Sequence, residues 1–176
     1  MTTLHPTHLP QRGQQPGADG RSALLLADAL RFAKNACAGR HDESGEAAIE
    51  HPLRVMATLH GDDEKVVALL HDTCAASGTG LVGLAGLRGF VPNRLLMAVT
   101  ALGHGFEEAD DVCFRFLLAD PIALAVKLAC IGDLTDPVRL AGLDPFTRRR
   151  RETAATTAAR GLGTTVAAIR MSFTMT

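Results

Sequence analysis

The 176-residue chain has no Trp and no Tyr, and it contains only seven Phe. A base-stacking platform, or an interface anchored by many aromatic side chains, is therefore not expected. An excess of one charge is also lacking, because 18 Lys and Arg residues are balanced by 19 Asp and Glu residues and the net charge is -1. This balance argues against a nucleic-acid partner and against a polybasic membrane-surface protein.

Long apolar runs are absent as well. The longest stretches, at 24–30 and 122–132, are too short or too interrupted to span a bilayer, so we predict no membrane partner. Residues 1–21 include three Pro and three Gly but lack the apolar core of a signal peptide, and we expect a disordered leader there. These features together predict a cytoplasmic protein.

The cysteines are few and widely spaced, and none of them forms a Cys-x-x-Cys pair. Most lie in apolar contexts with helical spacing, which favours buried free thiols over a disulfide framework. The same spacing argues against a zinc site built from thiolate pairs. The four residues are Cys37, Cys74, Cys113 and Cys130.

Apolar residues recur at helical spacing along most of the chain after the leader, and no segment alternates as a strand would. Ser22 is the expected N-cap of a helix over 22–38, which Gly39 would end. Asp62 or Asp63 is the expected N-cap of a later helix, because acidic residues are favoured at the positive end of the helix dipole.

Two Asp-Pro pairs, at 120–121 and 144–145, each combine an N-cap residue with a proline in the first helical turn. Together with the helical periodicity they predict an all-α single domain of seven or eight helices over residues 22–160. The tail at 161–176 has no clear period, and no structure is assigned to it.

The candidate chemistry begins with the adjacent His71 and Asp72 in an apolar helical stretch. Neighbouring positions on a helix differ by about 100°, so both side chains can reach an ion that lies beside the helix. A His-Asp pair alone is more often a buried His satisfied by a local carboxylate. His51, on the preceding predicted helix, favours a metal instead, because a His from one helix and a His-Asp pair from an antiparallel neighbour form a mixed nitrogen and oxygen site.

The sequence resembles the HD-superfamily metal-dependent phosphohydrolases in three successive motifs. These are EAAIEHPLRV at 46–55, ALLHDT at 68–73, and DPIALAVKLA at 120–129 followed by DLTDP at 133–137. The branch that it is most similar to is the (p)ppGpp hydrolase domain of the bacterial Rel/Spo stringent-response proteins and their small single-domain relatives. The resemblance covers residues 22–160. It implies an HD-type helical bundle that binds a divalent metal and a nucleotide or another phosphate-containing small molecule, and a homo-oligomer is compatible with it.

The resemblance also implies a set of metal ligands. In the family the ion, usually Mn²⁺, is held by the His of a His-Pro motif, by a His-Asp pair and by an Asp in a later helix. His51, His71 and Asp72 match the first three positions, whereas the fourth falls on Cys130. A thiolate there would suit Zn²⁺ better than Mn²⁺. Asp133, one helical turn further, is an alternative fourth ligand. The simpler interpretation of Cys130 is a small buried hydrophobic residue, and a site without any metal remains an alternative.

Other departures from the family affect catalysis and substrate binding. The acidic couple that follows the His-Asp pair in active members falls on Ala75 and Ala76, so the usual general base, worth about 10²–10⁴ in rate, is missing. Acidic residues at 42–43 replace positive charge before the His-Pro motif, and Leu134 stands where the family has Asn. Lys127 matches the family and is a candidate substrate-binding residue, although a lysine with its ammonium group in solvent is the simpler interpretation.

These departures lead to three functional hypotheses. The first is an HD-type scaffold whose (p)ppGpp 3'-pyrophosphohydrolase activity is weak or lost. The second is an active metal-dependent phosphohydrolase with another nucleotide substrate, and the third is a non-catalytic nucleotide sensor or protein-interaction module. The basic run at 148–151 is interpreted as a solvated helix face rather than an anion site.

Overall fold

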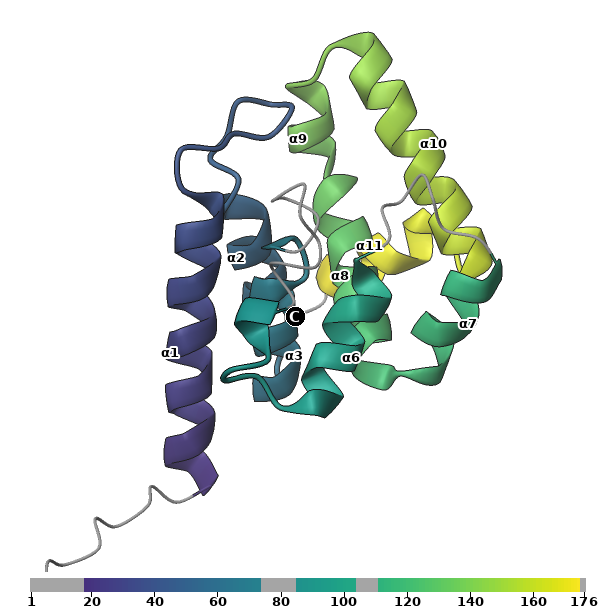
Figure 1. Ribbon diagram of the computed structural model, residues 1–176. Helices are drawn as coiled ribbons and strands as arrows, with labels where there is room; N and C mark the ends of the chain where they lie inside the picture. The colour runs from purple at the N-terminus through teal and green to yellow at the C-terminus, as the bar shows by residue number, and fades with distance from the viewer. Residues whose placement is uncertain (1–17, 74–84, 104–110, 175–176) are drawn as a thin grey trace, which may run out of the picture.

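The computed structural model describes residues 18–73, 85–103 and 111–174, which form a bundle of helices (Figure 1). The described ranges contain nine named helices, eight of them with at least eight residues. In the labels of Figure 1 they are α1 (Ala18–Cys37), α2 (Glu50–Ala57), α3 (Asp62–Leu70), α6 (Asn93–Leu102), α7 (Asp111–Ala119), α8 (Pro121–Leu134), α9 (Pro137–Ala141), α10 (Pro145–Gly161) and α11 (Val166–Thr174).

The predicted all-α single domain is confirmed, with slightly more helices than the seven or eight expected. No β-strand occurs within the described ranges, where the antiparallel bridge between His41 and Ala47 is isolated. None of the described helices combines the length and the apolar character needed to cross a membrane.

Helix α8 lies at the centre of the bundle. It packs against α2, α3, α6, α7, α10 and α11, so neighbours surround it on most sides (Figure 1). A helix in such a position has to be apolar around most of its circumference, and the sequence Ile-Ala-Leu-Ala-Val at 122–126 meets that requirement. Any polar side chain on α8 is therefore carried into the interior, where it needs a partner.

The Asp-Pro signals begin helices as predicted. The Asp120 carboxylate accepts hydrogen bonds from the backbone N–H groups of Ile122 and Ala123, at 2.9 and 3.1 Å, and caps α8. Asp144 caps α10 in the same way. A third pair at 136–137, which the sequence analysis did not assign to a helix, begins the short α9.

Two predicted caps were wrong. Ser22 is not the N-cap of α1, because the helix starts four residues earlier and the Ser22 hydroxyl instead donates to Asp62 at 2.8 Å. The two aspartates expected as caps of α3 lie inside that helix, and Gly61 is its N-cap, with its N–H donating to the Glu64 carboxylate. Gly39 does end α1, since it adopts the left-handed conformation with φ of 70°.

The helical unit continues past residue 160. The tail forms α11, which packs on α8 and buries Ile169. A Cβ atom at Gly132 of α8 would lie 3.1 Å from the ring of Phe173, so the absence of a side chain at Gly132 permits this close approach. The predicted leader falls mostly on residues 1–17, which lie outside the described residues.

Candidate metal centre

Three helices bring the candidate ligands together at one point. His51 lies in the first turn of α2, His71 directly follows α3, and Cys130 is on α8. Their ligand-capable atoms all lie within 4.8 Å of one another. Because α2, α3 and α8 pack against each other, these positions belong to the interior of the bundle rather than to a mobile surface loop.

Each imidazole is oriented by an acceptor on its Nδ1 side. His71 Nδ1 is 2.7 Å from the carbonyl oxygen of Ala68, and His51 Nδ1 is 2.7 Å from a carboxylate oxygen of Asp133. Since both partners only accept hydrogen bonds, each Nδ1 carries a proton and donates it. The Nε2 atoms therefore face the cluster, which is the arrangement found around metal-binding histidines.

Asp72 adds a carboxylate to the same point. One of its oxygens is 3.2 Å from His71 Nε2, and the other is 3.8 Å from His51 Nε2. Its side chain is 44% exposed, whereas the His71 side chain is 6% exposed. Asp72 therefore closes the cluster on its solvent side.

Cys130 lies between the two imidazoles, with Sγ 3.3 Å from His71 Nε2. Burial raises the pKa of this thiol, but His71 and His51 outweigh burial and lower the pKa to about 6. The residue is buried, as the simpler interpretation expected, yet it contacts nitrogen rather than only apolar atoms. The cluster thus offers two imidazole nitrogens, one sulfur and one carboxylate.

The protein supplies charge that favours protonated imidazoles in the absence of an ion. Burial lowers the pKa of His51, but the hydrogen bond with Asp133 and the Cys130 thiolate raise it to about 10 overall. For His71, burial again lowers the pKa, while Asp72 and Cys130 raise it to about 9. An ion that binds here therefore has to displace protons from nitrogen.

Asp133 lies on the opposite side of the His51 ring from the cluster. Besides the hydrogen bond from His51, its carboxylate accepts hydrogen bonds from Arg54 through both oxygens, at 2.7 and 3.2 Å. Arg139 Nε is 3.1 Å from one of these oxygens, Oδ1. Burial raises its pKa, but the hydrogen bonds from His51 and Arg54 lower it to about 2. Of the two candidates for the fourth ligand, Cys130 is the one brought to the Nε2 atoms, whereas Asp133 orients His51.

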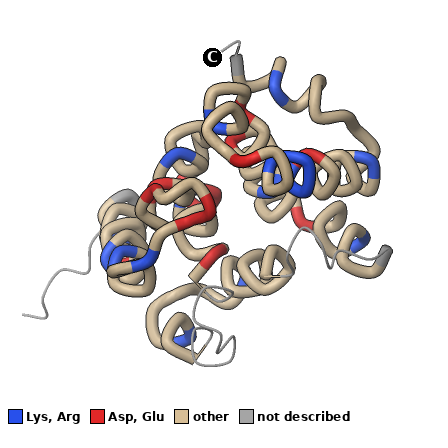
Figure 2. Tube along the Cα trace, turned by 90° about the horizontal axis from the view of Figure 1, so that it is seen from above, with Lys and Arg blue, Asp and Glu red and all other residues tan. Residues whose placement is uncertain are grey.

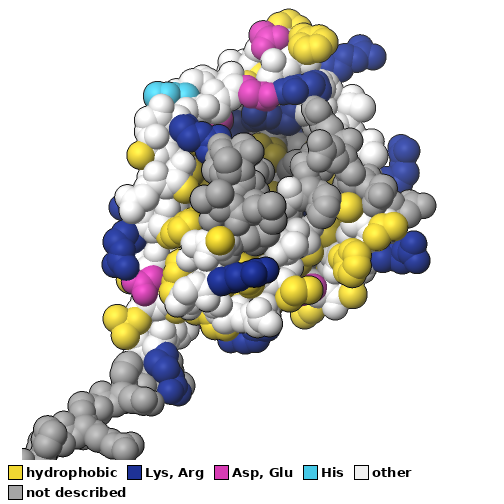
Figure 3. Space-filling view, viewed as in Figure 1, with side chains coloured by type: hydrophobic (Ala, Val, Ile, Leu, Met, Phe, Trp, Pro, Cys, Tyr) yellow, Lys and Arg dark blue, Asp and Glu magenta, His cyan; other side chains and the backbone are white. Residues whose placement is uncertain are grey.

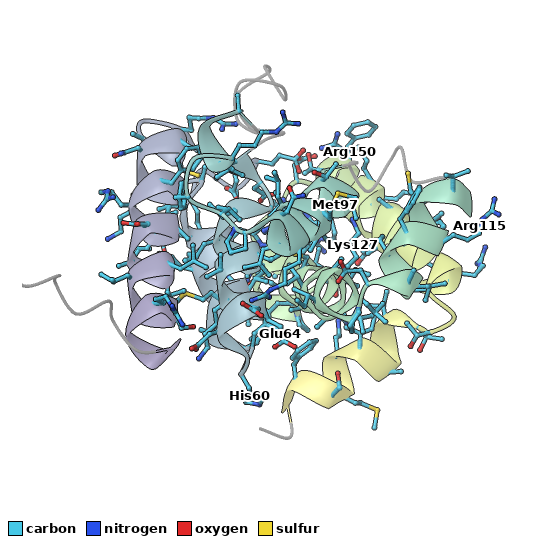
Figure 4. All side chains as sticks on the ribbon, turned by 60° about the horizontal axis from the view of Figure 1, so that its bottom comes forward. His60, Glu64, Met97, Arg115, Lys127 and Arg150 are labelled. Carbon is cyan, nitrogen blue, oxygen red and sulfur yellow. The ribbon has the colours of Figure 1, made fainter. Side chains whose placement is uncertain are left out.

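Lys127 precedes Cys130 by about one helical turn and is only 4% exposed. Figure 4 shows it inside the bundle, so its ammonium group is not simply solvated. Burial lowers its pKa, and the charges of Cys130 and Asp72 oppose that effect. Lys127 and Arg40 in turn both favour the charged form of Asp72. Positive charge therefore lies next to the cluster.

The basic run at 148–151 has structural partners. Arg148 donates to three carbonyl oxygens at the carboxyl end of α9, and Arg150 and Arg151 pair with Glu43 in the loop before α2. Figure 2 looks down on this end of the molecule, where the acidic residues of the loop and the basic residues of α10 both lie. On the face in Figure 3, described Lys and Arg side chains lie at this upper end, along the edges and across the lower centre of the molecule.

Two predictions concern residues that lie outside the described ranges. Ala75 and Ala76, where the family has its acidic couple, lie outside them. Cys74 lies outside them too. Cys37, Cys113 and Cys130 form no disulfide bond with one another, and Cys37 and Cys130 are buried, as the sequence predicted. The contribution of Asp133 to orienting His51 was missed, because nothing in the sequence links two residues that are 82 positions apart.

No protein-family model matches the chain, and no curated protein sequence matches it either. The functional interpretation therefore rests on the geometry of the cluster and on the sequence motifs.

Proposed function

We propose that this protein is an HD-type metal-binding protein that binds a phosphate-containing nucleotide, and that its (p)ppGpp 3'-pyrophosphohydrolase activity is weak or lost. One observation carries the proposal. His51, His71 and Asp72, which the family resemblance marks as metal ligands, lie on or next to two different helices. The two Asp72 oxygens lie 3.2 Å from His71 Nε2 and 3.8 Å from His51 Nε2.

The residues around the cluster suit an anionic ligand. A divalent ion held there would act as a Lewis acid on a phosphoryl oxygen. Lys127 and Arg40 lie where their positive charge acts on Asp72, next to the cluster, and both could bind the remaining phosphate oxygens. Burial already restricts the Lys127 side chain, so it would lose little conformational entropy when a ligand binds.

The same geometry supports weak rather than efficient hydrolysis. A general base has to be free to accept a proton from the attacking water. Asp72 faces the two Nε2 atoms, and Asp133 is engaged by His51 and Arg54, so neither carboxylate is placed for that task. The residues that would supply the acidic couple in the family are Ala75 and Ala76.

The test is to measure nucleotide binding, and release of phosphate or pyrophosphate, for (p)ppGpp and a panel of nucleotides with Zn²⁺ or Mn²⁺ supplied. We expect metal-dependent binding with little turnover, and loss of binding in His71→Ala and Lys127→Met. The variant Asp28→Asn, which removes an exposed ion pair on α1, is the matched control. Absence of binding for every nucleotide and metal would overturn the proposal.

A second candidate is an active phosphohydrolase on another nucleotide, and the intact arrangement of His51, His71 and Asp72 favours it. Turnover by the unaltered protein that His71→Ala abolishes would support this second function. Turnover only by a variant with Ala75→Glu, Ala76→Asp and Cys130→Asp would show a hydrolase scaffold that has lost its chemistry, as the first proposal expects.

A further inference from the structure

We propose that the cluster is a zinc site, in which His51, His71, Cys130 and Asp72 bind Zn²⁺ and which discriminates against the Mn²⁺ that the family resemblance implies. The inference rests on the ligands named in the proposed function, but it requires neither nucleotide binding nor hydrolysis. It concerns the point at which this chain departs from the family, the thiol of Cys130.

The separations between the donor atoms agree with a shared tetrahedral ion. With bonds of about 2.0–2.1 Å to nitrogen or oxygen and about 2.3 Å to sulfur, adjacent ligand atoms of zinc lie about 3.3–3.6 Å apart. Cys130 Sγ is 3.3 Å from His71 Nε2. One oxygen of Asp72 is 3.2 Å from His71 Nε2, and its other oxygen is 3.8 Å from His51 Nε2. His51, His71 and Cys130 offer ligand atoms that all lie within 4.8 Å of one another, so small side-chain movements would bring these three donors to zinc-ligand distances. The Asp72 carboxylate lies beside both Nε2 atoms and supplies the fourth donor.

The chemistry of the donors selects the metal. Thiolate and imidazole suit Zn²⁺, whereas Mn²⁺ favours oxygen ligands and octahedral coordination. Here two imidazoles and a buried thiolate supply three of the four donors, and Asp72 supplies the one oxygen. A carboxylate at position 130 would change this balance, because the site would then contain two oxygen donors and no sulfur.

The protein holds the donors in place before an ion binds. His71 Nδ1 donates to Ala68 and His51 Nδ1 donates to Asp133, so the direction of both Nε2 atoms is fixed by packing and hydrogen bonds. Burial of Cys130 in α8 fixes the third donor. Asp72 is the least buried of the four donors, so an ion would enter and leave on its side.

The first experiment uses the full-length protein after treatment with a chelator. Zn²⁺ and Mn²⁺ are titrated separately in competition with a chromophoric chelator, and Co²⁺ is titrated as a spectroscopic probe of the ligands. We expect one Zn²⁺ per chain, a preference for Zn²⁺ over Mn²⁺ on the order of 100-fold or more, and a thiolate-to-cobalt charge-transfer band with the strong visible bands of a tetrahedral ion.

Three variants assign the band to one thiol. Cys130→Ser should lose the charge-transfer band and bind Zn²⁺ at least about tenfold more weakly, since loss of a ligand should exceed the effect of losing an orienting group. Cys130→Asp should also lose the band and bind Mn²⁺ more tightly than the unaltered protein. Cys113→Ser, which removes a thiol from α7 outside the cluster, is the matched control and should retain the band and the affinity.

Circular dichroism establishes whether each variant is folded. If a variant does not fold, the visible spectrum of the cobalt-loaded unaltered protein decides whether a thiolate binds the ion. Cobalt binding without a charge-transfer band, equal affinities for Zn²⁺ and Mn²⁺, or no metal binding at all would overturn the zinc site. In those cases the cluster is a set of buried hydrogen bonds. Failure to bind or hydrolyse nucleotides would instead overturn the proposed function and leave the zinc site standing.

Discussion

Asp133→Asn should weaken metal binding although Asp133 does not face the cluster. The carboxylate accepts a hydrogen bond from His51 Nδ1 and fixes the proton on that atom. An amide can donate to Nδ1 instead, which would move the ring proton to Nε2, the atom that has to bind the ion. We therefore expect metal affinity to fall by about 10- to 100-fold, the usual effect of losing a group that orients a ligand.

The same substitution should also lower the free energy of unfolding, and the lowered pKa of Asp133 gives the size of that effect. Hydrogen bonds from His51 and Arg54 outweigh burial and lower this pKa from 3.8 to about 2. A lowering of that size corresponds to about 2–3 kcal/mol, and solvent screening of the partly exposed arginine reduces it to about 1–2 kcal/mol. Because the folded-state pKa is the lower one, this stabilisation is present above pH 3.8 and is lost as the pH falls through about 2.

Urea unfolding followed by circular dichroism, at neutral pH and at pH 2–4, measures the stability effect, and chelator competition measures the metal affinity. Asp28→Asn, which breaks an exposed ion pair with Arg31, is the control and should change neither quantity appreciably. The reasoning would be refuted if Asp133→Asn lowered stability at neutral pH but left the affinity for metal unchanged, because Asp133 would then stabilise the fold without orienting His51.

Three further predictions concern protons, capping and packing. The pKa values of His51 and His71 are raised from 6.5 to about 10 and about 9, so zinc has to displace protons from both rings. The affinity for zinc should therefore increase from pH 6.5 to 9. A pH-independent affinity measured by chelator competition would contradict this prediction. Asp120→Ala removes two capping hydrogen bonds from α8 and should cost about 1 kcal/mol in urea unfolding, and an unchanged unfolding midpoint would show that the cap is dispensable. Gly161→Ala should destabilise the protein by about 1–3 kcal/mol despite the better helix propensity of Ala, because the new Cβ collides with the Phe114 ring. Relief by Phe114→Leu in the double variant would confirm that collision, and additive effects would exclude it.

Local signals in the sequence specified much of the secondary structure. An N-cap carboxylate next to a proline acts on backbone groups only two or three residues away, which is why Asp120 and Asp144 could be assigned without a structure. Gly39 ends α1 for a similarly local reason, its positive φ. Ser22 is not a cap because α1 begins at Ala18, and its hydroxyl donates to Asp62, 40 residues away. The local sequence pattern contains no information about such a contact.

The sequence by itself therefore determined the helical class, several helix boundaries and the adjacent His and Asp residues at 71–72. Only the tertiary structure decided which side chain of α8 faces the Nε2 atoms of His51 and His71. Cys130 and Asp133 lie three positions apart on one helix, and both could serve as ligands in principle. The packing of α8 against α2 and α3 directs Cys130 toward His71, 59 positions away in sequence, and places Asp133 on the Nδ1 side of His51. Helical periodicity does not predict which of the two residues faces the Nε2 atoms, because it does not determine how the three helices are rotated about their axes.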